Sequence, residues 1–291
     1  MKHLYLVDGS GFIFRAYHAV RPLTRPDGIP VNAVYGFTQM LLKLVEESDA
    51  DHIAVIFDAA RKTFRNDIFP DYKAHRPPPP DDLIPQFDLV KEATKAFGLP
   101  AVEMPGYEAD DIIATYAKMG AEAGASVTIV SSDKDLMQLV GGRVSMFDSM
   151  KNRLIKSEEV IERFGVEPEK VVEVQALAGD SVDNVPGVPG IGIKTAALLI
   201  NEYGDLETLL EHAHKVKQKK RRENLIEFSE QARISHKLVQ LKQDVPVPNS
   251  LSEFARKQID IDKTIQFLSE QGFKSIISRL SVESQNSQQE Q

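Results

Sequence analysis

The sequence predicts an α/β domain with a mostly parallel sheet, followed by a helical domain. The first half alternates short, continuous apolar runs with amphipathic stretches of helical spacing. An apolar run without alternation is typical of a strand that is buried on both faces. From about residue 157, helical patterns follow one another with few β-rich runs. Strands alternating with helices favour a parallel sheet covered by helices.

The individual elements follow from these patterns. The expected strands are Leu4–Val7, Ile53–Phe57, Ala101–Met104 and Val127–Val130. Helical spacing of apolar residues predicts helices over Val34–Val45, Leu83–Phe97, Glu108–Ala123, Ser157–Phe164, Pro168–Ala178, Ile193–Tyr203, Leu206–Ala213 and Glu223–Leu241. Gly98 and Gly124 stand where a glycine commonly ends a helix.

We expect four segments along the chain. They are a catalytic domain at 1–164, a helical domain at 165–245, a C-terminal element at 246–280, and a Gln/Ser/Glu-rich tail at 281–291 with a composition typical of disorder. The N-terminal apolar run is too short for a signal peptide, and no run of 18 apolar residues occurs. The sequence therefore predicts no membrane attachment and a cytoplasmic location.

Composition excludes several kinds of chemistry. The chain has no cysteine, which excludes disulfides, cysteine-ligated zinc and a cysteine nucleophile. Its formal net charge of −8 argues by itself against a nucleic-acid-binding protein, because phosphate contacts need cations. However, nine carboxylates are candidate ligands, and without them the net charge would be +1. An acidic spot in a nearly neutral chain predicts bound cations.

Acidic residues follow all four expected strands. They are Asp8, Asp58, the group Glu108, Asp110 and Asp111, and the pair Asp133 and Asp135. A single acid after a strand is usually a helix N-cap. Four acidic strand ends in one sheet indicate a ligand-binding site, because ligands of open α/β sheets bind beyond the carboxyl ends of the strands.

Two further acids, Asp180 and Asp183, are three residues apart in Gly179-Asp180-Ser181-Val182-Asp183-Asn184, so one turn could direct both at the same target. Crowded carboxylates repel one another unless cations lie between them. Oxygen-only ligands favour Mg²⁺ or Mn²⁺, and nine carboxylates suit two ions. Two such ions can activate water and stabilise the leaving oxygen of a phosphodiester.

A glycine-rich segment follows at once. Gly187-Val188-Pro189-Gly190-Ile191-Gly192-Ile193-Lys194 has the pattern of the hairpin in a helix–hairpin–helix motif. Gly187, Gly190 and Gly192 would let the backbone approach a phosphate closely, and the next helix would present its positive end there. Such a hairpin reads the DNA backbone, not the bases.

Basic residues gather in two places. In residues 61–76, Arg61, Lys62, Arg65, Lys73 and Arg76 alternate with Phe64, Phe69 and Tyr72. Cations that hold phosphates and aromatics that stack on bases are typical of single-strand binding, although a solvated loop is the simpler alternative. Residues 215–222 contain six cations, which form either a phosphate-contacting face or a solvated helix start.

Together, these motifs are similar to one family. Val7-Asp8-Gly9-Ser10, Tyr72-Lys73-Ala74-His75-Arg76-Pro77, Glu108-Ala109-Asp110-Asp111, Asp133-Lys134-Asp135, Asp180–Asp183 and the hairpin occur in order from about residue 3 to 280. The chain resembles the 5′-nuclease domain of bacterial DNA polymerase I, a relative of flap endonucleases. One departure is Ser131-Ser132 before Asp133, where many relatives have a glycine.

The resemblance implies a PIN-like α/β domain with a helical arch at about 61–82, followed by a helix–three-turn–helix domain. It also implies a division of the ligands. Asp8, Asp58, Glu108, Asp110 and Asp111 would hold one metal ion, and Asp133, Asp135, Asp180 and Asp183 the other. Lys73 and Arg76 would contact the scissile phosphate, Tyr72 would stack on a base, and Arg15 and Arg65 would be further substrate contacts. Catalysis would involve Asp8, Asp58 and Asp111 together with Lys73 and Arg76. The hairpin, with Lys194, would bind duplex DNA, with K⁺ on its carbonyls.

The implied function is a two-metal 5′–3′ exonuclease and flap endonuclease. It would act on branched or flapped DNA and on RNA–DNA primers in replication and repair, as a monomer near the nucleoid, and it could be joined to a polymerase. Two alternatives stay open. A PIN-type ribonuclease would share the strand-end acids but lack the hairpin and the Asp180–Asp183 pair. A DNA-binding module would have the hairpin without catalysis.

Overall fold

A computed structural model gives the structure of the chain, and it describes residues 1–280. The chain forms two compact units. The first consists of Met1–Phe57, Pro78–Val102 and the segment from Asn249, and the second of Asp58–Pro77 and Glu103–Pro248. The tail predicted at 281–291 lies outside the described residues. No helix within residues 1–280 is long and apolar enough to cross a membrane.

The first unit contains three parallel strands in the order β3-β2-β1. They are β1 (His3–Asp8), β2 (His52–Ile56) and β3 (Ala101–Val102). The helices are α1 (Gly9–Ala19), α2 (Asn32–Glu47), α4 (Gln86–Ala96), the 3₁₀ helix η4 (Leu251–Phe254) and α12 (Ile261–Glu270). Tyr5 pairs with Ile53 and Val55 with Ala101. Leu4, Leu6 and Ile53 are fully buried, which confirms the prediction of strands covered on both faces.

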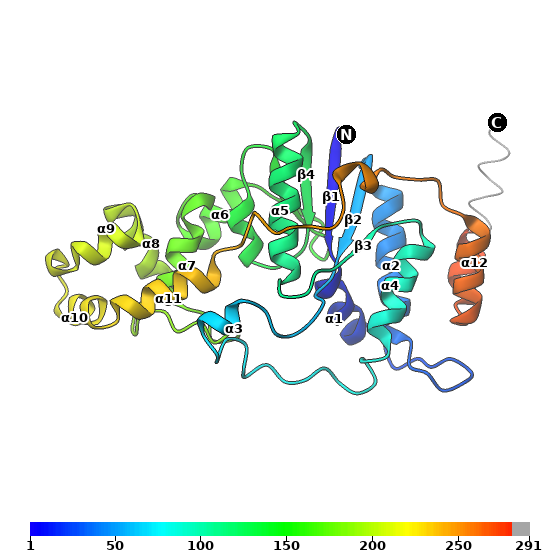
Figure 1. Cartoon of the computed structure of the whole chain (residues 1–291), viewed down its shortest axis with the longest axis horizontal. Coiled ribbons are helices and arrows are strands. Elements are labelled where there is room, and N and C mark those ends of the chain that lie inside the picture. The colour runs from blue at the N-terminus through cyan, green and yellow to red at the C-terminus, as the bar shows by residue number, and fades with distance from the viewer. Residues whose placement is uncertain (281–291) are drawn as a thin grey trace. The chain divides into compact units, whose positions relative to one another are not determined.

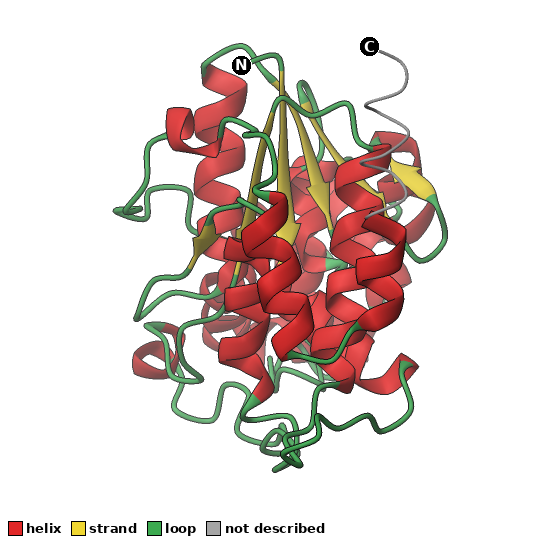
Figure 2. Cartoon of the chain, turned by 90° about the vertical axis from the view of Figure 1, so that its right-hand side faces the viewer, coloured by secondary structure: helices red, strands yellow, loops and turns green. Residues whose placement is uncertain are grey.

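The second unit contains the other strands in the order β4-β5-β6, with β4 and β5 parallel and β6 antiparallel. They are β4 (Ser126–Val130), β5 (Val144–Asp148) and β6 (Arg153–Ile155). The α-helices are α3 (Arg65–Ile68), α5 (Ala109–Glu122), α6 (Ser157–Phe164), α7 (Val171–Ala178), α8 (Ile193–Tyr203), α9 (Leu206–Glu211), α10 (Lys219–Glu227) and α11 (Ser229–Val239). The 3₁₀ helices are η1 (Asp135–Leu139), η2 (Pro168–Lys170) and η3 (Ala213–Lys215). Figure 1 shows α5 lying along β4, and Figure 2 distinguishes helices from strands by colour.

Some elements differ from the prediction. Helix α1 was not expected, and neither were β5 and β6, whose partly exposed residues lack a continuous apolar run. The single helix expected at Glu223–Leu241 is instead α10 and α11, because the chain leaves the helical conformation at Phe228 (φ −103°, ψ 22°). In the arch segment of the second unit, only α3 is an α-helix.

The two compact units do not divide at the boundary expected near residue 165. In the second unit, side chains of η1 join segments from both sides of that position. Gln138 donates to the Val239 carbonyl (3.0 Å) and accepts from the Leu241 N–H (3.0 Å), while Gln175 donates to Asp135. These bonds tie η1 to α7 and to the end of α11. The four segments expected from the sequence remain a prediction.

Candidate active site

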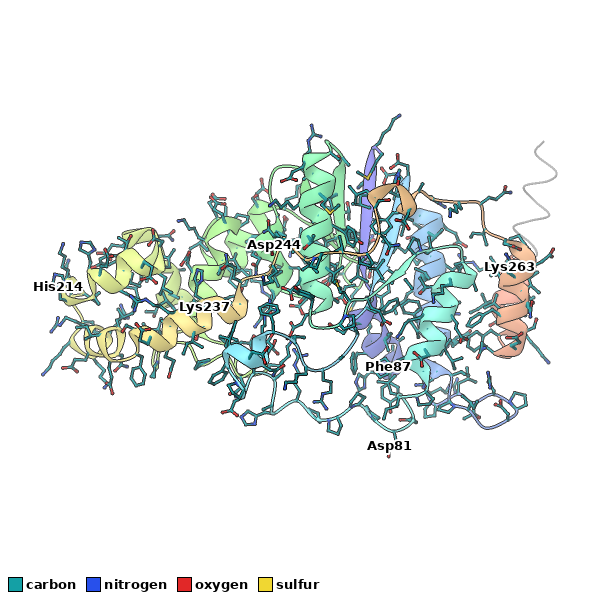
Figure 3. All side chains as sticks on the ribbon, viewed as in Figure 1. Asp81, Phe87, His214, Lys237, Asp244 and Lys263 are labelled. Carbon is teal, nitrogen blue, oxygen red and sulfur yellow. The ribbon has the colours of Figure 1, made fainter. Side chains whose placement is uncertain are left out.

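In the second unit, backbone geometry fixes the acids near the start of α5. Asp58 accepts a hydrogen bond from the Ala109 N–H at 2.8 Å, so the segment after β2 is attached to the first turn of that helix. An acid here is favourable because the first N–H groups of a helix lack intrahelical acceptors. Glu108, the N-cap residue, is 7% exposed. Figure 3 shows the side chains of the described residues on the ribbon.

The segment that carries Lys73 lies against two of these acids. The Lys73 ammonium donates to Glu108 at 2.9 Å and lies 3.7 Å from Asp183, and its backbone N–H donates to the Asp183 carbonyl at 2.9 Å. Burial by itself would lower the pKa of Lys73, but the charge of Glu108 raises it above its ordinary value. Lys73 also has a φ of 56°, in the left-handed region that a lysine seldom occupies. In this backbone conformation the Lys73 ammonium lies against the Glu108 and Asp183 carboxylates.

Two more cations neutralise the loop that follows α7. Arg76 forms an ion pair with Asp183, and Lys134 forms one with Asp180. Although burial opposes it, the hydrogen bond from Lys134 lowers the pKa of Asp180. In the second unit, two residues expected to contact phosphate, Lys73 and Arg76, therefore lie against two residues expected to hold metal, Glu108 and Asp183.

Asp133 and Asp135 form an acidic pair in which the charge of Asp133 acts on Asp135. The Asp135 N–H donates to the Asp133 carboxylate at 2.9 Å, which holds the two residues close together. Burial, and next the charge of Asp133, raise the pKa of Asp135 to about 6. A buried carboxylate beside a second acid would be stabilised by a bound cation.

This raised pKa gives a pH prediction for the metal-free protein. Between the ordinary pKa of 3.8 and about 6, the folded protein keeps a proton on Asp135 that the unfolded chain releases. Stability should therefore fall as the pH rises through this window. Asp135→Asn should lack this part of the pH dependence and be more stable than the wild type above pH 6. Urea unfolding of both proteins in chelator at pH 5 and pH 7 measures their free energies of unfolding. An equal pH dependence in both proteins would contradict the prediction.

Asp111 has an environment unlike that of a metal ligand. It is fully buried, and Arg65 donates to its two oxygens at 2.7 and 2.8 Å. The backbone N–H groups of Lys242 (2.9 Å) and Glu108 (3.2 Å) donate to the same oxygens. Four donors occupy the carboxylate, so no ligand position is presented to solvent.

Arg65 is correspondingly not placed for substrate binding. It is 1% exposed, and besides Asp111 it donates to the carbonyls of Leu238 (2.7 Å) and Gln240 (3.1 Å). Tyr72 is 5% exposed and donates to Glu108 at 3.3 Å, so its ring is not free to stack on a base in this conformation. The sequence pattern of cations and aromatics does not distinguish such inward-facing residues from exposed ones.

Asp8 and Arg15 belong to the first unit and are described within it. Asp8 ends β1 and caps α1, because its carboxylate accepts the Gly11 N–H at 2.8 Å. It is 7% exposed. Arg15 lies on α1 with its guanidinium 5.8 Å from the centre of the Phe12 ring.

The expected hairpin is present between α7 and α8. Gly187 and Gly190 have φ angles of 60° and 76°, which favour glycine, and Gly192 is the N-cap of α8. The first turn of α8 contains Lys194 and no acid, and no side chain caps it. An uncapped N-terminus with a cation suits an anion. Sequence reasoning missed Asn224, Gln231 and Ser235, which contact this hairpin from α10 and α11; no local pattern marks them.

The donor set fits hard divalent ions in its chemistry, since it consists of carboxylates with excess negative charge. Within residues 1–280, however, no group of three or more His, Cys, Asp or Glu side chains is close enough to hold a metal ion. Lys73, Arg76 and Lys134 are instead the counterions of Glu108, Asp183 and Asp180. A bound ion would take the place of these internal cations.

Comparison with known proteins identifies the class of protein. Residues 3–165 match the family model "5′-3′ exonuclease, N-terminal resolvase-like domain", and residues 166–262 match "5′-3′ exonuclease, C-terminal SAM fold". These matches cover the α/β part and the helical part in the predicted order. The chain belongs to the 5′–3′ exonuclease family, a family of nucleases, which confirms the resemblance found in the sequence.

Individual relatives agree with this assignment. The chain is 54% identical over 286 residues to DNA polymerase I of Rhizobium leguminosarum, covering 96% of this chain but 28% of that protein. It is 41% identical over 280 residues to the 5′-3′ exonuclease of Aquifex aeolicus, covering 96% of each. A structure of T5 5′-exonuclease with divalent metal ions (zinc) bound has a TM-score of 0.70 and 25% identity, covering 92% of this chain and 99% of that one.

Proposed function

We propose that the chain is a metal-dependent, structure-selective 5′ nuclease that cuts flaps and removes 5′ nucleotides from DNA and RNA–DNA primers. The observation that carries the proposal is the contact of Lys73 and Arg76 with Glu108 and Asp183. Cations suited to a phosphate and carboxylates suited to metal ions lie in one place. The family assignment and the divalent ions of the T5 relative support it.

The metal ligands that we propose follow the resemblance with one change. Asp8, Asp58, Glu108 and Asp110 would hold one Mg²⁺ or Mn²⁺ ion, and Asp133, Asp135, Asp180 and Asp183 the second. We infer that Asp111 is instead a structural partner of Arg65, because four donors already occupy its oxygens. When bound, the ions would supply water activation and stabilisation of the leaving oxygen.

The protein's own residues would bind and orient the substrate. Lys73 and Arg76 would exchange their carboxylate partners for the scissile phosphate, since both are charge-assisted donors. Arg15 would contact a phosphate from the first unit. The role of Tyr72 in base stacking requires the ring to leave its place against Glu108.

The hairpin would bind the downstream duplex through backbone N–H groups at Gly187, Gly190 and Gly192, aided by Lys194. K⁺ at this hairpin fits one observation, since the buried Asn224 Oδ1 atom lacks a hydrogen-bond partner among the described residues. With DNA as substrate, the protein would work as a monomer at the nucleoid in the cytoplasm. The polymerase relatives favour a role in replication and repair.

The test is cleavage of a 5′-labelled flap DNA beside a single-stranded RNA of equal length, with Mg²⁺ and with chelator. We expect cutting at the flap junction in Mg²⁺ only. Preferred cutting of the RNA would favour the PIN-type ribonuclease. Flap binding without cleavage in either Mg²⁺ or Mn²⁺ would favour the binding module, and either result would refute the proposal.

Lys73→Ala and Arg76→Ala should slow cleavage with a smaller effect on duplex binding. Each removes one charge-assisted contact to a phosphate whose charge develops in the transition state, which costs roughly 2–4 kcal/mol, or about 30- to 1000-fold. Single-turnover rates and duplex affinities of both variants measure the split. A loss confined to affinity, with an unchanged single-turnover rate, would exclude this role.

A further inference from the structure

Side chains of α10 and α11 hold the backbone of the hairpin in the second unit. The Asn224 amide donates to the Pro189 carbonyl at 2.7 Å. The Gln231 amide donates to the Gly187 carbonyl at 2.7 Å, and the Gly187 N–H donates to the Ser235 hydroxyl at 2.9 Å. Three side chains, 35 to 48 residues away in the sequence, thus bind two hairpin residues.

The base of the hairpin has no room to adjust. A Cβ atom at Gly187 would lie 2.5 Å from the Gly179 nitrogen, and a Cβ atom at Gly179 would lie 2.6 Å from the Val185 carbonyl oxygen. The two glycines are therefore packed backbone to backbone. Val188 adds a hydrogen bond from its N–H to the Leu177 carbonyl at 2.8 Å. Gln231 and Ser235 therefore hold a hairpin base that close packing already fixes.

The tip of the hairpin, at Pro189 and Gly190, is not packed in this way. There Asn224 binds the peptide group between these two residues. The Pro189 carbonyl and the Gly190 N–H belong to the same planar trans peptide, so they point in opposite directions. Because the carbonyl points at the Asn224 amide, the Gly190 N–H points away from Asn224. Asn224 is 6% exposed, so water does not compete for its amide. Gly190, whose φ is 76°, could otherwise rotate this peptide at little cost.

We propose that Asn224 is a positioning residue for DNA binding. It fixes the Pro189–Gly190 peptide so that the Gly190 N–H, and not the carbonyl oxygen, faces a phosphate. This inference rests on the proposed function, because it assumes that the hairpin binds the DNA backbone. A flipped peptide would present an oxygen to the phosphate, exchanging a hydrogen bond for repulsion. Asn224 acts on affinity without touching the DNA.

The experiment compares Asn224→Ala and Asn224→Asp with the wild type. The aspartate has the same shape but no donor, and its charge would repel the Pro189 carbonyl. Asn201→Asp is a matched control, since the Asn201 amide on α8 donates to the Gly165 carbonyl at 2.9 Å, away from the hairpin. Lys237→Ala, on the exposed surface of α11, controls for a change of the helix itself (Figure 3).

We measure two quantities on each folded variant. One is the Kd for flap DNA in chelator, and the other is kcat at saturating flap DNA in Mg²⁺. We expect Kd to rise about tenfold in both Asn224 variants, as for one lost hydrogen bond to a charged group, with kcat within threefold of wild type. Both controls should keep the wild-type Kd. A merely structural Asn224 would lower the melting temperature and leave the Kd of the folded protein unchanged.

A rise in Kd of less than threefold, or an equal rise in Asn201→Asp, would overturn the proposal. If both Asn224 variants fail to fold, an amide-to-ester replacement of the Pro189–Gly190 peptide bond takes their place, because it removes the Gly190 N–H and leaves a residue without a side chain that can keep the φ of 76°. An unchanged Kd in that variant would overturn the proposal in the same way. Failure of the wild type to bind flap DNA would instead refute the proposed function.

Discussion

Asp8→Asn is expected to lower single-turnover flap cleavage by at least about 1000-fold, equivalent to about 4 kcal/mol of transition-state stabilisation. The change removes one negative charge from the proposed metal ligands while keeping the size of the side chain. Folding should be preserved, because Asp8 caps α1 through the Gly11 N–H and asparagine caps helices about as well as aspartate. Binding of flap DNA in chelator should be equal or tighter, since one repelling charge is gone.

Two measurements separate this outcome from simple damage. Single-turnover cleavage in Mg²⁺ and flap binding in chelator are compared for wild type, Asp8→Asn and Asp88→Asn. Asp88 lies on α4 in the same unit with a side chain that is 88% exposed, so its change should have no effect. Cleavage by Asp8→Asn within about tenfold of wild type, or binding that is lost together with activity in a folded protein, would contradict the assignment.

Arg65→Met is expected to destabilise the protein by about 3–5 kcal/mol, because it leaves the Asp111 charge buried without its partner. Both side chains are 1% exposed or less, so solvent cannot replace the lost contacts. The carbonyls of Leu238 and Gln240 also lose their donor. Urea unfolding followed by circular dichroism measures the change.

The double variant Arg65→Met, Asp111→Leu is the control. Replacing a buried ion pair by apolar residues of similar volume is often close to neutral, so the double variant should recover much of the lost stability. A single variant within about 1 kcal/mol of the wild type would show that the pair does not hold this part of the second unit together.

The sequence predicted the parallel strands because β1, β2 and β4 are continuously apolar and buried. It did not predict β5 and β6, because strands with exposed residues give a weak apolar signal. Helix α1 was missed for another reason. An acid after an apolar run indicates a metal ligand here, but the Asp8 carboxylate also caps α1, which is the clearest sign that a helix starts at Gly9.

For the candidate site, the sequence indicates which residues to consider but not how deeply each one is buried. Asp110 and Asp111 are adjacent acids in one motif, yet only burial and the four donors distinguish Asp111 as a structural residue. The contacts that decide this come from Arg65 and from Lys242, 46 and 131 residues away. The same holds for Asn224, whose role depends on a carbonyl 35 residues away. Such long-range pairs leave no local pattern in a single sequence.

The proposed function requires that the candidate carboxylate ligands bind two divalent ions at the place where DNA is cut. The most direct measurement is the number of Mn²⁺ ions bound per chain, counted by electron paramagnetic resonance with flap DNA present and corrected for Mn²⁺ bound by the DNA. We expect two ions in the wild type and fewer in Asp183→Asn. A wild type that binds no Mn²⁺ above the DNA background, while still cutting the flap, would contradict it.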